Sequence, residues 1–241
     1  MATIKGTSRA DVIDASARTD TLTIYGQGGN DTIYGGRGID KIYGGGGNDR
    51  IYASPFDTLI DGGAGTDTVY FSSYVADATG YGVDVRLFGG HIGLWPNEEG
   101  AVVPEYPSGT IKNVENVVGS DYDDAILGNT AVNRLSGGAG DDWMMAFGSG
   151  DFLTGGAGAD MFSFENAGAK TTVTDFSYAD GDRLFFKYDP DISWVKGSAP
   201  DAGGVSRVAW IGTYLDPNGV SEQVIVLGAT QPASDWIISL G

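Results

Sequence analysis

Residues 26–70 read GQGGNDTIY, GGRGIDKIY, GGGGNDRIY, ASPFDTLID and GGAGTDTVY, which are consecutive blocks of nine residues. The sixth position of these blocks holds Asp31, Asp40, Asp49, Thr58 and Asp67, and the eighth holds Ile33, Ile42, Ile51, Ile60 and Val69. Residues 119–163 keep the same phase in GSDYDDAIL, GNTAVNRLS, GGAGDDWMM, AFGSGDFLT and GGAGADMFS. A fixed period of this kind predicts a chain of stacked, nearly identical units.

Each block combines a turn with a short strand. Glycine accepts the positive φ angles that a tight turn needs, so the Gly-rich first six positions form the turn. The last three positions, such as residues 32–34, form a strand whose middle side chain points inward. A single Ile cannot be buried alone, so the blocks must stack into an apolar column. Two blocks complete one coil, and successive coils rise by ~4.8 Å, the spacing of neighbouring strands.

This register places carboxylates above one another. Asp31 lies over Asp49 and Asp49 over Asp67 in the first run, and Asp124, Asp142 and Asp160 follow one another in the second. Two carboxylates ~4 Å apart repel by ~1 kcal/mol in water and ~4 kcal/mol near a protein surface. A hard dication reverses the sign of this term, and Ca²⁺ accepts six to eight oxygen ligands, including backbone carbonyls. The sequence therefore predicts a coil that folds when it binds calcium.

The shared pattern is GGxGxDxUx, in which U is a large apolar residue. Blocks that begin at Gly35, Gly44, Gly62, Gly137 and Gly155 match it closely. The pattern resembles the RTX (repeats-in-toxin, or hemolysin-type) calcium-binding family, whose fold is a parallel β-roll. The expected metal ligands, through side chains or loop carbonyls, are Gly28, Asp31, Gly35, Gly36, Arg37, Gly38, Asp40, Gly44, Gly46, Gly47, Asp49, Gly62, Gly63, Gly65, Asp67, Asp124, Asn133, Gly137, Gly138, Gly140, Asp142, Asp151, Gly155, Gly156, Gly158 and Asp160.

Two blocks depart from the pattern. Pro55 replaces a Gly-rich turn position and Thr58 replaces the ligand Asp, so we expect a poorer site between the loops that begin at Gly35 and Ala53. Asn133 should weaken the second run similarly, because a neutral amide attracts a dication less than a carboxylate does. Tyrosines share the ninth position of several blocks, and we expect them to form a ladder on one exterior face: Tyr34, Tyr43, Tyr52 and Tyr70.

The periodicity divides the chain into four parts. Residues 1–70 form an N-terminal β-roll that includes two weaker turns, with Asp11 and Asp20 at the sixth position. Residues 71–118 form an insertion, with a strand at residues 83–88 followed by a Gly-rich turn and a loop. Residues 119–163 form a second roll segment. Residues 164–241 form a β cap, as in the family, with strands expected at residues 173–176, 183–188, 205–211 and 223–227. The expected fold is all-β: a parallel β-roll in two segments.

Composition excludes several function classes. The 241 residues carry a formal net charge of −18, which argues against nucleic acid or anionic membranes as direct partners. The chain has no Cys, and no apolar run approaches the length of a membrane span. It has one histidine, His91, and lacks the HExxH signature that accompanies similar repeats in secreted proteases. We find no recognisable catalytic motif and expect the protein not to be an enzyme.

The C-terminal residues 235–241 place an acidic residue ahead of an apolar tail. They are similar to the uncleaved C-terminal signals of type I secreted RTX proteins, which implies export by type I secretion machinery. Extracellular calcium modules bind with dissociation constants of about 10⁻⁴ to 10⁻³ M, so such loops would be empty in the cytosol. An alternative, compatible with the first, is that Trp236, Ile237 and Leu240 form a last core strand.

The insertion is the expected binding region for a further partner. Trp95, Glu98, Glu99 and Tyr106 combine aromatic rings with carboxylates, which can hold a sugar by stacking and hydrogen bonding. Alternatively, these aromatic side chains cover the flank of the roll. We expect a role in extracellular adhesion or in binding a polysaccharide or surface. The alternatives are a polysaccharide-modifying enzyme that uses carboxylates of the insertion, and a membrane-active effector, against which the charge argues.

Overall fold

The computed structural model describes residues 1–72, 80–95, 108–148, 150–164, 170–186, 192–215, 221–227 and 237–239. Throughout these ranges the regular elements are β-strands, which confirms the expected all-β parallel roll. The chain divides into two compact units, Met1–Ala125 and Ile126–Gly241.

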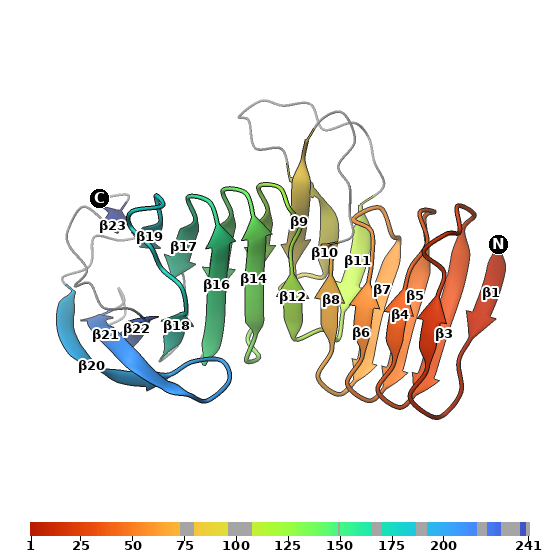
Figure 1. Ribbon diagram of the computed structural model, residues 1–241, viewed down its shortest axis with the longest axis horizontal. Helices are drawn as coiled ribbons and strands as arrows, with labels where there is room; N and C mark the ends of the chain where they lie inside the picture. The colour runs from red at the N-terminus through yellow and green to blue at the C-terminus, as the bar shows by residue number, and fades with distance from the viewer. Residues whose placement is uncertain are drawn as a thin grey trace. The chain divides into compact units, whose positions relative to one another are not determined.

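In the first unit the strands from β1 to β8 alternate between two sheets and form a coil (Figure 1). One sheet has the order β1 (Ala2–Lys5), β3 (Leu22–Gly28), β5 (Lys41–Gly46), β7 (Leu59–Ala64), β11 (Gly109–Lys112), β10 (His91–Trp95) and β9 (Gly82–Arg86). The other has the order β2 (Val12–Asp14), β4 (Thr32–Tyr34), β6 (Arg50–Tyr52), β8 (Thr68–Tyr70) and β12 (Asn116–Val118). Consecutive blocks therefore lie on opposite sheets, as a coil of two blocks requires.

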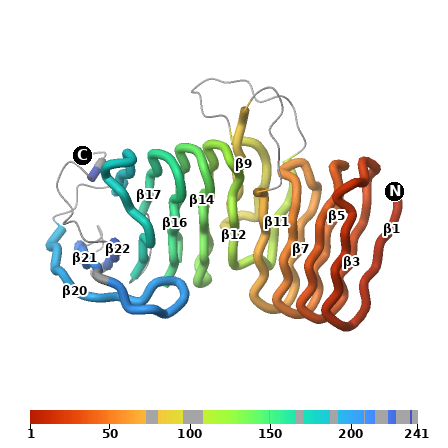
Figure 2. The backbone as a smooth tube through the Cα atoms, in the orientation of Figure 1, coloured from red at the N-terminus to blue at the C-terminus, as the bar shows by residue number. Residues whose placement is uncertain are grey.

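Parallel pairing stacks equivalent residues of alternate blocks. Ile42 pairs with Ile24 and Ile60 in one sheet, and Ile51 pairs with Ile33 and Val69 in the other. These side chains are fully buried and form the predicted apolar column between the sheets. Figure 2 shows the chain from β3 to β7 winding as successive turns of one coil.

The described part of the insertion contains more strands than the sequence predicted. β9 and β10 form an antiparallel hairpin, so the predicted loop at Trp95 is wrong and that residue ends a strand. Alternation of buried and half-buried residues in β10 shows why, because Ile92 and Leu94 pack inward. The coil also resumes before the nonapeptide motif does: β11 pairs in parallel with β7, and β12 with β8.

The second unit also contains two sets of parallel strands, and it ends in a meander. β13 (Ala125–Leu127) lies at its boundary, and β15 (Trp143–Ala146), β17 (Met161–Phe164), β19 (Arg183–Phe186) and β23 (Ile237–Ser239) pair in parallel in that order. β14 (Arg134–Ala139), β16 (Asp151–Ala157), β18 (Thr171–Val173) and β22 (Ser221–Leu227) do the same. β22, β21 (Ser206–Leu215) and β20 (Ser193–Pro200) then pair antiparallel.

The meander of β20, β21 and β22 lies within residues 164–241, and its role as a cap stays a prediction. It has a small core of Ala199, Ala209, Ile225 and Leu227. Each of the four strands expected after residue 163 overlaps an observed strand, whereas β20 was not anticipated. Ile237 lies in β23, so part of the C-terminal tail forms a strand of the roll. Trp236 and Leu240 lie outside the described residues.

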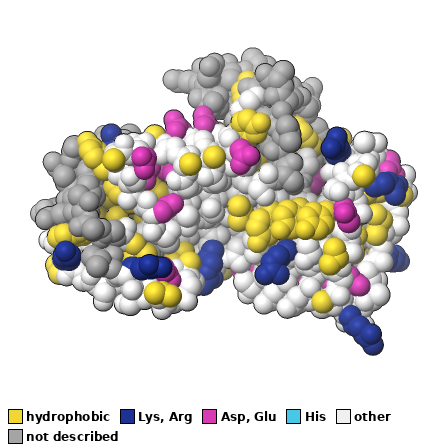
Figure 3. Space-filling model, in the orientation of Figure 1, with side chains coloured by type: hydrophobic (Ala, Val, Ile, Leu, Met, Phe, Trp, Pro, Cys, Tyr) yellow, Lys and Arg dark blue, Asp and Glu magenta, His cyan; other side chains and the backbone are white. Residues whose placement is uncertain are grey.

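The tyrosines form two ladders rather than one. Tyr52 stacks on Tyr34 and on Tyr70, with ring centroids 4.5 and 4.7 Å apart. Tyr43 instead stacks on Tyr25 at 4.8 Å, because its block lies on the opposite sheet. In Figure 3 a continuous hydrophobic stripe crosses the face over β4, β6 and β8, where the first ladder lies. The ladders stabilise the outer faces of the sheets.

Candidate metal centre

Aspartates line both edges of the roll in the first unit. The first edge consists of the loops that follow β3, β5 and β7 and carry Asp31, Asp49 and Asp67. The second edge consists of the loops that follow β4 and β6 and carry Asp40 and Asp57. All five side chains are at most 1% exposed. Burial of so many ionisable groups requires partners for their oxygens.

One oxygen of each carboxylate lies on a backbone amide of the neighbouring coil. On the first edge, Asp49 Oδ1 accepts a hydrogen bond from the Asp31 amide at 2.8 Å, and Asp67 Oδ1 accepts one from the Asp49 amide at 2.7 Å. On the second edge, Asp57 Oδ1 accepts one from the Asp40 amide at 2.9 Å. The carboxylates therefore stack as predicted, but each rests on a peptide N–H instead of facing a bare carboxylate.

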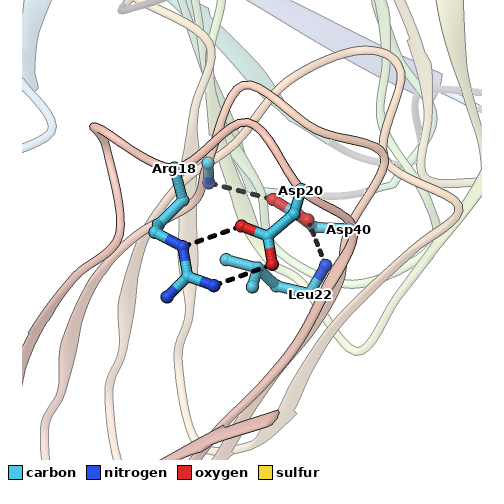
Figure 4. A network of polar contacts seen from close by, with 5 residues as sticks. Arg18, Asp20, Leu22 and Asp40 are labelled. Atoms are coloured by element: carbon cyan, nitrogen blue, oxygen red, sulfur yellow. Dashed lines mark hydrogen bonds and ion pairs between the residues drawn. The ribbon is translucent and has the colours of Figure 1, made fainter. Parts of the chain in front are cut away.

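On the second edge the other oxygen is satisfied as well. Asp40 Oδ2 accepts a hydrogen bond from the Gly36 amide at 2.9 Å, and Asp57 Oδ2 accepts one from the Ser54 amide at 3.0 Å. Figure 4 shows Asp40 with the Leu22 amide, which donates to its Oδ1 at 2.7 Å. Loops of this kind are closed by their own backbone amides, and calcium ligation by the loop at residues 35–40 stays a prediction.

Two sequence assignments on this edge are corrected. Asp57, and not Thr58, occupies the ladder position, because the loop at residues 53–58 is one residue shorter between its capping amide and its aspartate. Asp20 does not enter the ladder at all. It is exposed and makes a two-pronged ion pair with Arg18, at 2.7 Å for each contact (Figure 4).

On the first edge the second oxygen is open. Oδ2 of Asp31, of Asp49 and of Asp67 is buried and has no hydrogen-bond partner. A Cβ placed on Gly44 would overlap both Asp49 Oδ2 and the carbonyl oxygen of Gly62, so these two oxygens face one small space. A Cβ on Gly26 would likewise overlap Asp31 Oδ2 and the carbonyl oxygen of Gly44. Each space is lined by oxygen atoms, and it stays empty because the neighbouring residue is a glycine, which has no Cβ.

The two edges differ in the length of the strand that precedes each loop. β3, β5 and β7 run on into their glycines, so the amides there pair with the next coil: Gly29 donates to Gly46 O at 2.7 Å and Gly47 to Ala64 O at 2.8 Å. β4 and β6 end at tyrosine, which frees a loop amide to cap the aspartate. Gly47 also has φ +127° and lies against the backbone of Gly29, a position that a side chain would disrupt.

The second run shows the same two kinds of loop. In the second unit, Asp160 Oδ1 accepts a hydrogen bond from the Asp142 amide at 3.0 Å, while Asp160 Oδ2 is buried and unpartnered. By contrast, both oxygens of Asp151 accept hydrogen bonds, from the amides of Asn133 at 2.8 Å and of Gly148 at 3.2 Å. Asn133 Oδ1 accepts a hydrogen bond from the Asn129 amide at 2.8 Å. Asp124, in the first unit, accepts hydrogen bonds from Ser120 and Val83.

The open oxygens fit a hard cation. Within the described ranges no three His, Cys, Asp or Glu side chains converge on a point, so backbone carbonyls must supply most ligands. Calcium accepts such mixed oxygen sets, whereas Mg²⁺ demands a small octahedral shell. Burial raises the pKa of Asp67 and of Asp160 to about 6, because loss of solvent around the ionised carboxylate outweighs the hydrogen bond that each accepts from a neighbouring amide. A bound dication would stabilise the ionised carboxylates.

Some ladder residues lie outside the motif. Glu115 Oε2 accepts a hydrogen bond from the Asp67 amide at 2.8 Å, and Asp182 Oδ1 accepts one from the Asp160 amide at 3.0 Å. Each of these two carboxylates occupies the position that the aspartate of a further repeat would have. Neither was predicted, because neither stands in a Gly-rich block. The only available signal was position: Glu115 precedes the second run and Asp182 follows the last block, each where a further coil would stack.

Acid is expected to weaken calcium binding. In the calcium-free coil, the raised pKa of Asp67 and Asp160 means that the folded chain binds more protons than the unfolded chain between about pH 4 and 6. Acidification therefore stabilises the calcium-free coil, and this stabilisation is lost as pH rises through about 6. Calcium competes with these protons, so at about pH 5 each such site should need about tenfold more calcium. Calcium titrations followed by circular dichroism at about pH 5 and at neutral pH measure this difference. A calcium midpoint that is the same at both pH values would contradict carboxylate ligation.

The hairpin of the insertion carries a separate polar cluster. Arg86 makes a two-pronged ion pair with the buried Asp84, at 2.8 and 2.7 Å, and His91 Nε2 lies 3.6 Å from Asp84 Oδ2. His91 and Trp95 share the half-buried face of β10. Of the predicted ligand-binding residues, Glu98, Glu99 and Tyr106 lie outside the described residues.

One family of known repeats matches the stacked loops. The RTX calcium-binding nonapeptide repeat matches in four copies, at residues 25–57, 43–73, 118–146 and 127–162. No curated protein matches the chain. Among solved structures, the AlgE6R3 subunit of the Azotobacter vinelandii mannuronan C5-epimerase is similar, with 22% identity, a TM-score of 0.40 and coverage of 52% of this chain and 77% of that one.

The extracellular lipase LipA of Serratia marcescens is also similar, with 15% identity, a TM-score of 0.29 and coverage of 98% of this chain. This chain spans 40% of the lipase. At these TM-scores neither likeness bears on function. The repeat matches cover both runs in which the stacked carboxylates lie. Residues 25–73 and 118–162, which together are less than half of the chain, therefore match RTX calcium-binding nonapeptide repeats.

Proposed function

We propose that calcium binds in the first-edge loops and drives folding of the roll. The observation that supports this is the set of buried, unpartnered Oδ2 atoms of Asp31, Asp49, Asp67 and Asp160. An ionised carboxylate oxygen without a partner opposes folding, and a cation that bridges it to a neighbouring carbonyl removes this penalty. The site does not exist in the unfolded chain, so calcium binding energy becomes folding energy.

A calcium titration tests this proposal. Circular dichroism should show β-structure that appears cooperatively near millimolar calcium, within the ~10⁻⁴ to 10⁻³ M range of extracellular modules. Magnesium at the same concentration should be far less effective because of its octahedral preference. Fully formed β-structure in excess chelator would contradict the proposal.

We also propose that the protein acts outside the cell and leaves it by type I secretion. A roll that folds only near millimolar calcium would stay unfolded in the cytosol and fold after export. The net charge of −18 is consistent with a chain whose carboxylates repel one another until calcium is bound. Among the described residues no helix is long and apolar enough to cross a membrane. Deletion of residues 235–241 should abolish export through a type I system if they are the signal.

For the folded protein we propose binding of an extracellular polysaccharide or surface. The supporting feature is the hairpin face of the insertion, where Trp95 lies on the same side of β10 as His91, next to the Asp84–Arg86 pair. Aromatic rings beside fixed polar groups are suited to sugar binding. A glycan array with and without calcium tests this, and Trp95→Ala should abolish any calcium-dependent signal. Turnover of an array hit would instead favour a polysaccharide-modifying enzyme.

A further inference from the structure

The segment that returns from the insertion occupies the next coil position above the Asp67 loop. Between β11 and β12 the chain passes through Asn113 and Glu115. Glu115 Oε2 accepts the Asp67 amide at 2.8 Å, and the Asn116 amide donates to Asp67 O at 3.0 Å. A segment without the nonapeptide motif is thus docked on the last loop of the first edge by contacts equivalent to those between repeats.

In this segment the carbonyl of Asn113 stands where a repeat glycine would place its own. A Cβ on Gly26 would overlap Asp31 Oδ2 and Gly44 O, and one on Gly44 would overlap Asp49 Oδ2 and Gly62 O. A Cβ on Gly62 would overlap Asp67 Oδ2 and Asn113 O. The three spaces share one construction: an aspartate Oδ2 from one loop and a carbonyl oxygen from the coil above it.

The backbone at Asn113 is held in the conformation that this arrangement requires. Its φ is +52°, in the left-handed region that residues other than glycine rarely adopt. Its side-chain Nδ2 donates to Asp61 Oδ1 at 2.8 Å, and Lys112 Nζ lies 3.0 Å from Asp61 Oδ2. These two contacts to β7 fix the turn and with it the direction of the Asn113 carbonyl.

The oxygen that faces this carbonyl has no other partner. Asp67 is fully buried, its Oδ1 accepts the Asp49 amide, and its Oδ2 has no hydrogen bond. Two acceptor oxygens, one of them a carboxylate, cannot satisfy each other, since neither carries a proton at neutral pH in the ionised state. A hard divalent cation satisfies both.

We propose that a divalent cation such as calcium binds between the carboxylate of Asp67, in the last repeat block of the first run, and the carbonyl of Asn113, which lies outside the repeat motif. This ion fastens the segment that returns from the insertion to the roll. This inference rests on the proposed calcium binding of the first edge. β11 pairs with β10, so the hairpin that carries His91 and Trp95 is attached to a strand whose end this ion holds. Calcium thereby controls the order of the candidate ligand-binding face as well as that of the roll.

A matched pair of isosteric variants tests the proposal. Asp67→Asn and Asp31→Asn both keep the Oδ1 acceptor and both replace an unpartnered, buried carboxylate oxygen by an uncharged group. Equilibrium dialysis in excess calcium should show one ion fewer in each variant than in the wild type. Hydrogen exchange followed by mass spectrometry should show faster exchange in residues 109–118, by about tenfold or more, in Asp67→Asn alone.

The ion counts and exchange rates of the two variants distinguish this inference from the proposed function. An unchanged ion count in Asp67→Asn, with one ion lost in Asp31→Asn, overturns the inference but leaves calcium binding by the repeats intact. Unchanged counts in both variants overturn the proposed function. Equal exchange at residues 109–118 in the two variants shows that no ion fastens the insertion.

The wild-type protein decides the matter if Asp67→Asn does not fold. An anomalous difference map from crystals grown with calcium should show a peak bonded to both Asp67 Oδ2 and Asn113 O. A peak between Asp49 and Gly62 without one at Asn113 would overturn the inference.

Discussion

Gly44→Ala is expected to abolish one calcium site and to raise the calcium midpoint of folding by tenfold or more, which corresponds to at least ~1.4 kcal/mol. The added methyl group would occupy the space that Asp49 Oδ2 and Gly62 O share, so the cation and the neighbouring coil are both displaced. Backbone strain makes no contribution, because Gly44 does not have a positive φ. Calcium titration by circular dichroism gives the midpoint, and equilibrium dialysis gives the number of ions.

Gly46→Ala is the matched control, from the same strand. A Cβ on Gly46 has nothing within 4 Å, and its φ is also outside the positive region. Its midpoint should stay close to that of the wild type, since the substitution keeps the Gly46 carbonyl and creates no overlap, and such changes alter stability by about 0.5 kcal/mol or less. Equal shifts of the calcium midpoint in the two variants would show that the space beside Asp49 is not a binding site. The shifts would then come from the loss of a glycine at either position.

Asp49→Ala is expected to have the largest effect of any single carboxylate replacement in the first run. The Asp49 carboxylate faces the space closed by Gly62 O, and the preceding strand β5 supplies Gly44 O to the space beside Asp31. Removal of the side chain deletes a charged ligand and also leaves the buried Asp31 amide without its acceptor, which alone costs about 1–3 kcal/mol. The calcium midpoint should rise by tenfold or more, measured as for Gly44→Ala.

Asp11→Ala is the comparison for this variant. Asp11 has the same place in a terminal coil, but its Oδ2 accepts hydrogen bonds from the Thr7 amide, at 2.5 Å, and from Thr7 Oγ1, at 2.8 Å, in an exposed turn. Its replacement should shift the midpoint only slightly, because no open oxygen is lost. Equal midpoints for Asp11→Ala and Asp49→Ala would contradict the stacked register and the role of the open oxygens.

Much of the fold could be predicted because the repeat is a local rule. Ile42 pairs with Ile24 and Ile60 as the period requires, and the loops of alternate blocks stack as expected. The insertion and the cap were less predictable, since they do not repeat the nine-residue pattern. β10 was missed because Gly93 interrupts its alternation, although its partner β9 lies close by in the sequence.

The nine-residue period is enough to predict a coil with an inner apolar column and aspartates at its edges. Which of these aspartates keep an oxygen without a partner follows from the pairing of the strands in space. The loops at residues 35–40 and 44–49 share the GGxGxD pattern, yet Asp40 is capped by Gly36 and Asp49 Oδ2 is not capped. The reason is that capping depends on whether the loop amides pair with the next coil, and this is set by where each strand ends. The same applies to Asn113, whose carbonyl reaches Asp67 only because β11 resumes the coil.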